Sequence, residues 1–218
     1  MVPKAKIDVK ICGLNSAAAA KAAGDGAAMI GFVFYPPSPR AIKAKQAAEL
    51  GELLPASVAR VGLFVDPDDE KIEAVLKEAS LDWLQLHGEE TPERLEEIKK
   101  RFGLPLIKAV KIARAEDVAR AEAFYPVADK ILFDSRPPAS LKGALPGGNA
   151  LAFDWTLLSG FKSPLPWMLS GGLTVKNLGR AVAQSGARAV DVSSGVEDAP
   201  GVKNPAKIRE FLEAAAKL

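Results

Sequence analysis

The sequence predicts an α/β protein built as a single (β/α)8 TIM barrel with eight parallel strands. Three observations lead to this prediction: short apolar runs recur eight times, helix-like segments separate them, and the composition shows no break along the 218 residues. Strict alternation of strand and helix requires parallel strands joined by crossover helices. An open doubly wound sheet is the alternative, but no run is followed by the GxGxxG fingerprint of a dinucleotide site. We therefore expect residues 1–218 to form one barrel domain.

The expected strands are mostly short, rich in Val, Ile, Leu and Phe, and bounded by Gly, Pro, Asp or Ser. In chain order they are IDVKIC (7–12), AMIGFVF (28–34), VARVGLFV (58–65), DWLQLH (82–87), LPLIKAV (104–110), DKILFD (129–134), LPWMLS (165–170) and RAVDVSS (188–194).

Between these runs lie segments with the apolar spacing of amphipathic helices. The segment 68–79 repeats apolar residues on one helical face, and 91–102 begins with a threonine cap and a proline in the first turn. A third stretch, 204–218, repeats the pattern. The weakest link in the alternation is 135–150, a loop rich in Pro and Gly that only a short candidate helix around DWTLLSGF follows.

Composition and charge narrow the class of protein. With 29 Lys and Arg against 27 Asp and Glu, and no strongly basic segment, we expect no nucleic-acid partner. One cysteine cannot form an internal disulfide, which indicates the reducing cytoplasm. The longest run without charge, 26–39, carries three prolines, and the chain starts without an apolar signal core. That run is shorter than the roughly 20 residues of a membrane helix, so we expect a cytoplasmic protein without a membrane partner.

The only cysteine, Cys12, closes the first run directly before Gly13. In a barrel of this kind, the carboxyl ends of the strands and the loops after them carry the activity. Because side chains alternate along a strand, Lys10 shares the face of Cys12, and a cation so close lowers the pKa of a thiol. A small buried hydrophobe is the alternative for a lone cysteine. The position at the end of the strand favours a functional role.

Asp134 ends the sixth run after three apolar residues. A carboxyl group there can cap the following loop, or it can act as a general acid where the site is dry enough to keep it protonated. Its position alone does not separate the two interpretations.

Arg40 and His87 are further candidates at the same end of the barrel. Arg40 follows the rigid PPSP loop, so its guanidinium would be presented with little entropy to lose, and a planar carboxylate is its best partner. A solvated surface arginine is the alternative. His87, the only histidine, can be a base, a donor to substrate or a core residue. One histidine and one cysteine do not make a metal-ligand cluster, so we expect no metal.

The strongest local signal is a pair of small-residue turns after the last two runs. Gly171 and Gly172 lie in LSGGL, and Ser193, Ser194 and Gly195 lie in VSSGV. Glycines let the backbone approach a ligand, and free amide groups in such turns point at anions. These are the loops in which barrels of this class bind phosphate, so we expect a phosphate site rather than two ordinary turns.

Taken together, the motifs resemble the phosphoribosylanthranilate isomerase family of tryptophan biosynthesis. The motifs are KICGL, GFVFYPPSPR, VGLFV, LQLHG, FDS, PGG before FDW, LSGGL and VDVSSGVEDAPGVKN, and their order and spacing carry the resemblance from about Lys10 to Asn204. The resemblance implies a (β/α)8 barrel that converts N-(5-phosphoribosyl)anthranilate to 1-(2-carboxyphenylamino)-1-deoxyribulose 5-phosphate. The reaction is an Amadori rearrangement without a cofactor. The implied partner is a small phosphosugar, and the implied assembly is a monomer or homodimer.

Carried over motif by motif, the resemblance implies Cys12 as the general base and Asp134 as the general acid. It implies that Arg40 holds the anthranilate end of the substrate. It also implies that the two glycine turns, with Asp191 nearby, hold the phosphate and ribose. Lys10 and His87 complete the expected substrate site.

One loop departs from the family pattern. The family often has Gly-Gly-Thr-Gly or Gly-Gly-Asn-Gly where this chain has Gly147, Gly148, Asn149 and Ala150. If the last position has positive φ, alanine there costs about 1 kcal/mol and would affect closure of the loop rather than the chemistry.

Two rival interpretations accompany the resemblance. A related ribose-phosphate isomerase of histidine biosynthesis resembles this family but uses two aspartates, where Cys12 stands first here. A phosphosugar-binding barrel without catalysis would keep the glycine turns and need neither Cys12 nor Asp134.

Overall fold

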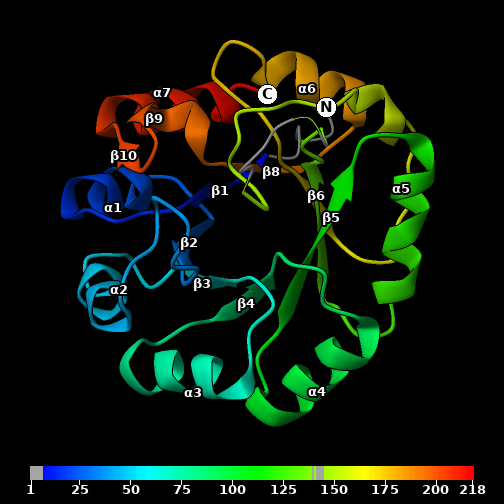
Figure 1. The fold of residues 1–218 in the computed structure, drawn as a ribbon. Coiled ribbons are helices and arrows are strands. Elements are labelled where there is room, and N and C mark those ends of the chain that lie inside the picture. The colour runs from blue at the N-terminus through cyan, green and yellow to red at the C-terminus, as the bar shows by residue number, and fades with distance from the viewer. Residues whose placement is uncertain (1–6, 139, 141–144) are drawn as a thin grey trace.

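Eight strands pair in chain order and close into a barrel in the computed structural model, which describes residues 7–138, 140 and 145–218. Each neighbouring pair is parallel, and β8 pairs with β1 to complete the ring. Figure 1 shows the strands in the centre with the helices arranged around them. The predicted (β/α)8 fold is confirmed.

Each expected apolar run overlaps one strand of the barrel, and β5 and β6 continue beyond the ends of their runs. The strands are β1 (Asp8–Cys12), β2 (Met29–Val33), β3 (Ala59–Phe64), β4 (Trp83–Leu86), β5 (Leu106–Ile112), β6 (Lys130–Ser135), β7 (Trp167–Leu169) and β8 (Ala189–Val192). The helices are α1 (Ala17–Gly24), α2 (Ala44–Gly51), α3 (Asp69–Glu78), α4 (Pro92–Phe102), α5 (Ala115–Ala119), α6 (Leu178–Ser185) and α7 (Pro205–Ala216), with short 3₁₀ helices η1 (Arg120–Phe124), η2 (Trp155–Leu158) and η3 (Ser194–Val196).

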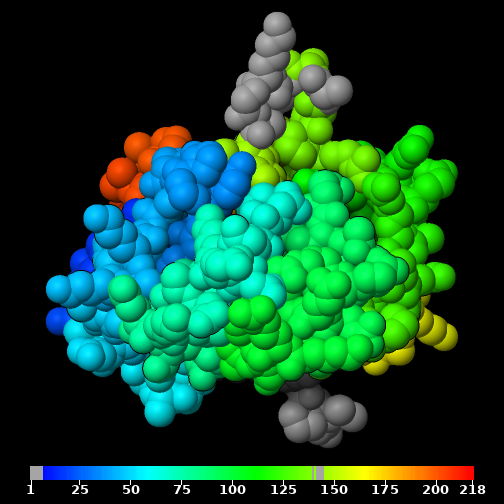
Figure 2. All heavy atoms as spheres, turned by 60° about the horizontal axis from the view of Figure 1, so that its bottom comes forward, coloured from blue at the N-terminus to red at the C-terminus, as the bar shows by residue number. Residues whose placement is uncertain are grey.

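The helix boundaries follow local signals in the sequence. Thr91 caps α4 by accepting a hydrogen bond from the Arg94 amide, and Gly103 ends the helix in the left-handed conformation at φ 67°. On the inner faces, Ile72 of α3 and Ile98 of α4 are fully buried. Side chains of α2, α3 and α4 form a closed outer wall on the side seen in Figure 2. In the part of the chain that the structure describes, no helix is long and apolar enough to cross a membrane.

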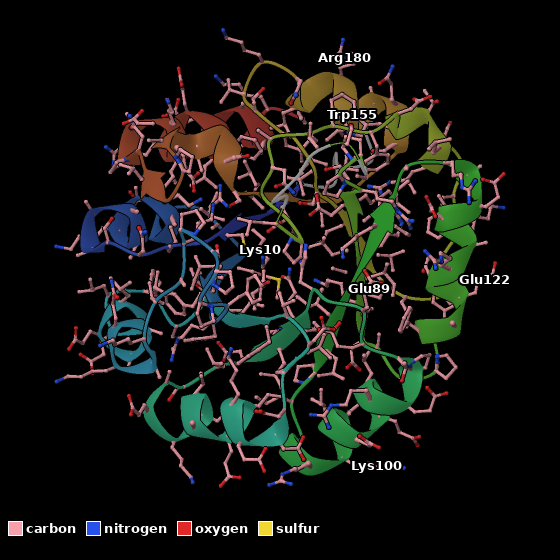
Figure 3. All side chains as sticks on the ribbon, viewed as in Figure 1. Lys10, Glu89, Lys100, Glu122, Trp155 and Arg180 are labelled. Carbon is pink, nitrogen blue, oxygen red and sulfur yellow. The ribbon has the colours of Figure 1, made fainter. Side chains whose placement is uncertain are left out.

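Between β6 and β7 the chain forms only the four-residue η2, as the weak pattern there indicated. Aromatic packing covers the sheet instead: the rings of Phe133, Phe161 and Trp167 meet edge to face, with centroids 5.2–5.9 Å apart. Trp155 of η2 lies under Arg180 of α6, whose guanidinium is 5.5 Å from the ring centroid (Figure 3). Side chains therefore cover the sheet where the connection between β6 and β7 lacks a full helix.

Apolar side chains fill the barrel interior below its carboxyl end. They come from alternate positions of the strands: Met29, Val61, Ile107, Ala109, Leu132, Met168 and Ala189. Between this apolar layer and the carboxyl end of the barrel, the interior becomes polar. Lys10 lies near the centre of the ring in Figure 3, whereas Lys100, Glu122 and Arg180 lie on its outer rim. The core therefore places its polar groups at one end, where the strands lead into loops.

An antiparallel hairpin after β8 was not expected from the sequence. It consists of β9 (Glu197–Ala199) and β10 (Val202–Lys203), joined through Gly201 at φ 82°. Strands of three and two residues are too short to show an apolar period. The hairpin lies beside α1 and α7 in Figure 1 and carries two charged side chains toward the mouth of the barrel, as described below.

Candidate active site

A cavity opens at the carboxyl end of the barrel. Most of the residues expected at the site line it: Cys12, Arg40, His87, Asp134, Gly171, Gly172, Asp191, Ser193 and Ser194. Two do not: Lys10 lies beneath the cavity wall, only 1% exposed, and Gly195 lies behind its turn. Among the described residues, no group of three His, Cys, Asp or Glu side chains is arranged to hold a metal ion.

Cys12 ends β1 with its thiol at the cavity, and Lys10 lies on the same face of the strand. Gly31 of the neighbouring β2 leaves the space that both side chains occupy. A Cβ atom at Gly31 would lie 3.0 Å from the Cys12 Sγ and 3.1 Å from the Lys10 Nζ. The predicted neighbourhood of thiol and ammonium is therefore present, and it depends on a residue without a side chain on the next strand.

The electrostatic consequence differs from the prediction. Burial raises the pKa of the Cys12 thiol, and the charge of Lys10 opposes this shift without cancelling it. Asp191 adds to the effect of burial, because its Oδ1 accepts a hydrogen bond from the Lys10 Nζ at 2.7 Å and places a negative charge near the thiol. Burial alone would lower the pKa of Lys10, but Asp191 and Cys12 outweigh it and the pKa is raised. The expectation of a lowered thiol pKa was wrong because burial, the largest cause of the shift, outweighs the charge of Lys10, and the negative charge of Asp191 adds to the rise.

Asp191 is buried between two donors. Besides Lys10, the Ser170 hydroxyl donates to its Oδ2 at 3.1 Å. A carboxylate accepts hydrogen bonds only, so its remaining lone pairs suit the hydroxyl groups of a sugar rather than a phosphate.

Asp134 lies at the end of β6 in contact with His87 from β4. The His87 Nε2 is 3.2 Å from the Asp134 Oδ2, and the Ser135 amide donates to Oδ1 at 2.8 Å. The His87 Nδ1 lies 2.8 Å from the Gln85 Nε2. With the amide in this orientation, the ring proton lies on Nε2 and is directed at the aspartate. One row of side chains thus runs from the barrel interior to the carboxyl group at the cavity.

Arg40 is buried and fully directed by its neighbours. Its Nε and Nη2 each donate to Glu197 at 2.8 Å, and Nη2 also donates to the Gly148 carbonyl at 3.2 Å. Lys203 reaches the same carboxylate at 2.6 Å, and it also donates to the Ser193 carbonyl at 2.9 Å. The interpretation of Arg40 as a solvated surface residue is therefore wrong.

The two glycine turns lie side by side after β7 and β8. Gly171 and Gly172 have φ values of 90° and 61°, a left-handed conformation that suits glycine. Among the described residues, the amide groups of Gly172, Ser194 and Gly195 have no hydrogen-bond acceptor. Buried or half-buried amides without partners are rare unless a ligand or water completes them. Gly195 packs against the Leu173 carbonyl, so it contributes backbone rather than cavity surface.

The loop before η2 folds over the cavity. Asn149 closes it by bonding both the amide and the carbonyl of Leu145, at 3.1 and 2.7 Å. A Cβ atom at Gly147 would lie 2.5 Å from the His87 Nε2 and 2.9 Å from the Asp134 Oδ2. Ala150 has a φ of 56°, so the positive φ considered from the sequence is present, at a cost of about 1 kcal/mol.

Two residues of the site, Glu197 and Lys203, were missed by sequence reasoning. Gln85 shares the strand face of His87, as alternation predicts, and Ser170 lies in the expected LSGGL turn. No local signal identifies Glu197 and Lys203, since their partners are fixed by the path of a loop.

Comparison with known proteins agrees with this geometry. The family model of N-(5'phosphoribosyl)anthranilate (PRA) isomerase matches residues 9–214. The chain belongs to the phosphoribosylanthranilate isomerase family. A phosphoribosylanthranilate isomerase of Paramagnetospirillum magneticum is 54% identical over 211 residues, which cover 96% of this chain and 97% of the relative. One of Rhodospirillum centenum is 53% identical over 214 residues, covering 97% and 99%.

Solved structures of phosphoribosylanthranilate isomerases have the same fold. The enzyme of Thermotoga maritima superposes with a TM-score of 0.84 at 37% identity, covering 97% of this chain and all of that one. A phosphoribosylanthranilate isomerase in complex with reduced 1-(o-carboxyphenylamino)-1-deoxyribulose 5-phosphate superposes with a TM-score of 0.82 at 36% identity, again over 97% of this chain. The chain is thus an isomerase of tryptophan biosynthesis.

Proposed function

We propose that this cavity converts N-(5-phosphoribosyl)anthranilate to 1-(2-carboxyphenylamino)-1-deoxyribulose 5-phosphate with Cys12 as general base and Asp134 as general acid. The observation that carries the proposal is that one cavity is lined by a thiol, a carboxyl group, a buried arginine and two turns with free amides. These are the groups that a phosphosugar with an aromatic carboxylate requires. Membership of the family, and the product analogue bound to a related isomerase, support it.

In the first step, the carboxyl group of Asp134 protonates the ring oxygen of the ribose. The bond from C1′ to that oxygen breaks, and the lone pair of the anthranilate nitrogen forms a Schiff base. The acid must hold a proton at this moment, and the His87 Nε2–H orients the carboxyl group by donating a hydrogen bond to its Oδ2. The Ser135 amide fixes the carboxyl group in one orientation.

In the second step, the Cys12 thiolate removes the proton from C2′. The electron pair of that C–H bond moves into the C1′–C2′ bond and neutralises the iminium nitrogen, giving an enolamine. Tautomerisation of the enolamine then gives the ketose. Lys10 lies beside the thiol and stabilises its ionised form against the cost of burial.

The two ends of the substrate are bound by different chemistry. The amides of Gly172 and Ser194, in two adjacent turns, suit the phosphate dianion. Arg40 suits the carboxylate on the anthranilate ring, and Asp191 suits the ribose hydroxyl groups. The distance between the two anionic ends then fixes the reacting carbon atoms between Cys12 and Asp134.

We further propose that the chain acts in the cytoplasm as a monomer or homodimer of one barrel domain, without a cofactor. The near-balanced charge and the single cysteine support the compartment. The isomerase of Thermotoga maritima is described as dimeric. Light scattering during size exclusion would decide between the two assemblies.

Loss of anthranilate fluorescence on mixing with N-(5-phosphoribosyl)anthranilate tests the reaction directly. We expect Asp134→Asn to abolish nearly all turnover while a product-like ligand still binds within about tenfold, roughly 1.4 kcal/mol. Asp117 is a matched control: it is equally buried and caps the start of α5, away from the cavity. Asp117→Asn should lower stability but leave kcat unchanged.

Ordinary turnover by Asp134→Asn would make Asp134 a loop cap and would require another general acid. If the natural protein binds phosphate but causes no loss of anthranilate fluorescence, the result would instead support a phosphosugar-binding barrel without catalysis.

A further inference from the structure

Glu197 is the most completely engaged acidic residue at the mouth of the barrel, and the reaction described above does not use it. We propose that Glu197 is a positioning residue that fixes the Arg40 guanidinium with one edge toward the cavity, and that it thereby sets the preference for a substrate carrying a ring carboxylate. This inference rests on the proposed function.

The contact between Glu197 and Arg40 is bidentate. Oε1 accepts from Nε and Oε2 accepts from Nη2, both at 2.8 Å, so the carboxylate and guanidinium planes are locked together. Glu197 is only 9% exposed and Arg40 only 5%. Burial alone would raise the pKa of Glu197, but Arg40 and Lys203 outweigh it and the pKa is lowered. The carboxylate therefore stays ionised and keeps its hold on the arginine.

Two glycines leave the space that the Arg40 side chain occupies. A Cβ atom at Gly13, which has a φ of 80°, would lie 2.7 Å from the Arg40 Cδ. A Cβ atom at Gly148 would lie 2.5 Å from the Arg40 Nη1. The aliphatic part of the side chain thus rests on one backbone and the head group on another. A side chain at either place would strain the backbone, because both glycines have positive φ, and would displace Arg40.

The arrangement leaves one edge of the guanidinium available. Arginine has five N–H donors, and Glu197 and the Gly148 carbonyl engage those on Nε and Nη2. Among the described residues, Nη1 has no hydrogen-bond acceptor, and Arg40 lines the cavity. A carboxylate that enters the cavity therefore meets donors whose direction is already fixed.

Lys203 connects this contact to the other end of the site. Its ammonium bonds the Glu197 Oε1 at 2.6 Å and the Ser193 carbonyl and hydroxyl at 2.9 and 3.1 Å. The hairpin of β9 and β10 thus fixes the distance between Arg40, which would bind the ring carboxylate, and the turn at Ser193, which would bind the phosphate. Fixed separation limits the substrates to those whose two anionic groups match it.

Binding of two ligands tests the inference. One is reduced 1-(o-carboxyphenylamino)-1-deoxyribulose 5-phosphate, and the other is the same molecule without the ring carboxyl group. We expect the natural protein to bind the carboxylated ligand at least tenfold more tightly. Glu197→Gln keeps the shape but removes the charge, and we expect it to reduce this preference at least fivefold, with KM rising more than kcat falls.

Glu90→Gln is the matched control. Glu90 is also buried and bonds the Lys108 ammonium at 2.6 Å, but it lies outside the cavity. Its replacement should lower the melting temperature without changing the ratio of the two affinities. Glu197→Asp serves as a second variant: it keeps the charge on a shorter side chain, and we expect a ratio between those of the natural protein and Glu197→Gln.

The outcomes separate the inference from the proposed function. If the natural protein binds neither ligand, the proposed function fails. If it prefers the carboxylated ligand and both Glu197 variants keep that preference, Glu197 is only structural. If Glu197→Gln binds the carboxylated ligand more tightly, Glu197 competes with the substrate for Arg40, and the positioning role is overturned.

Discussion

At the scale of single residues, the surroundings of Cys12 set the stability of the thiolate that the proposed second step requires. The thiol lies at the end of β1 between apolar neighbours, an ammonium group and the space left by Gly31. Its burial disfavours the thiolate that the reaction needs, and Lys10 offsets part of this cost.

Replacing Cys12 with serine tests its role as the base. We expect Cys12→Ser to lower kcat by about two orders of magnitude or more, because an alcohol is a far weaker base than a thiolate. Binding of the reduced product analogue should change little, since the two side chains have similar shapes. Stopped-flow fluorescence and calorimetry measure the two quantities. Turnover near that of the natural protein would favour His87 as the base.

The pKa of Cys12 also predicts how activity depends on pH. The base acts as the thiolate, so kcat/KM rises as the pH rises through the pKa of this group. Burial raises that pKa, which moves the rising limb above the range of an ordinary thiol. The rate of alkylation by a thiol reagent reports the ionisation of the same group, because Cys12 is the only cysteine. Lys10→Met should move both profiles to still higher pH, and unmoved profiles would show that Lys10 does not act on the thiol.

Alternation along a strand was sufficient to place Lys10 beside Cys12, because both residues belong to β1. It could not show that Asp191, 181 positions away, shares the charge of Lys10. The pairing of Arg40 with Glu197, 157 positions apart, was out of reach for the same reason. Partners of this kind are fixed by barrel closure and loop path, which no local pattern contains.

At the scale of elements, each strand and most helices follow from periodicity and caps. The apolar runs predicted all eight strands, and the threonine cap of α4 predicted where that helix begins. The hairpin of β9 and β10 was missed because its strands are too short to show a period. It nevertheless carries Glu197 and Lys203, so a small element without a sequence signal shapes the mouth of the site.

The loop over the cavity gives a prediction at this scale. Ala150 holds a φ of 56°, which costs an L-residue about 1 kcal/mol relative to glycine. Ala150→Gly removes this cost from the closed loop, although glycine also loses more entropy on ordering. We expect KM to fall by up to about fivefold, the factor that corresponds to 1 kcal/mol. An unchanged or higher KM would mean that loop closure does not limit substrate binding.

At the scale of the whole molecule, the fold separates stability from chemistry. Apolar side chains fill the lower barrel, while Cys12, Asp134 and the two glycine turns lie at the carboxyl end on different strands. The sequence was sufficient to predict this division, because alternating elements and polar strand ends recur along the chain. A ligand that joins these loops should therefore stabilise the barrel as a unit.

Inorganic phosphate provides the test of that expectation. Binding to the folded state alone stabilises it by RT ln(1 + [L]/Kd), which is about 1.4 kcal/mol at tenfold excess over Kd. For a chain of this size we expect the melting temperature to rise by about 3–6 °C. Phosphate should also compete with substrate, with an inhibition constant equal to the Kd from the melting curves.

Gly172→Ala should abolish both effects. A Cβ atom at Gly172 would lie 2.7 Å from the Ala152 amide nitrogen, so it would displace the turn that is expected to bind the anion. Gly103→Ala is the control: Gly103 has a φ of 67° but open space around it, so its replacement adds backbone strain without touching the turn. If Gly103→Ala loses phosphate binding to the same extent, the loss reflects general destabilisation. If phosphate stabilises the natural protein but does not compete with substrate, the anion binds elsewhere and the two turns are ordinary ones.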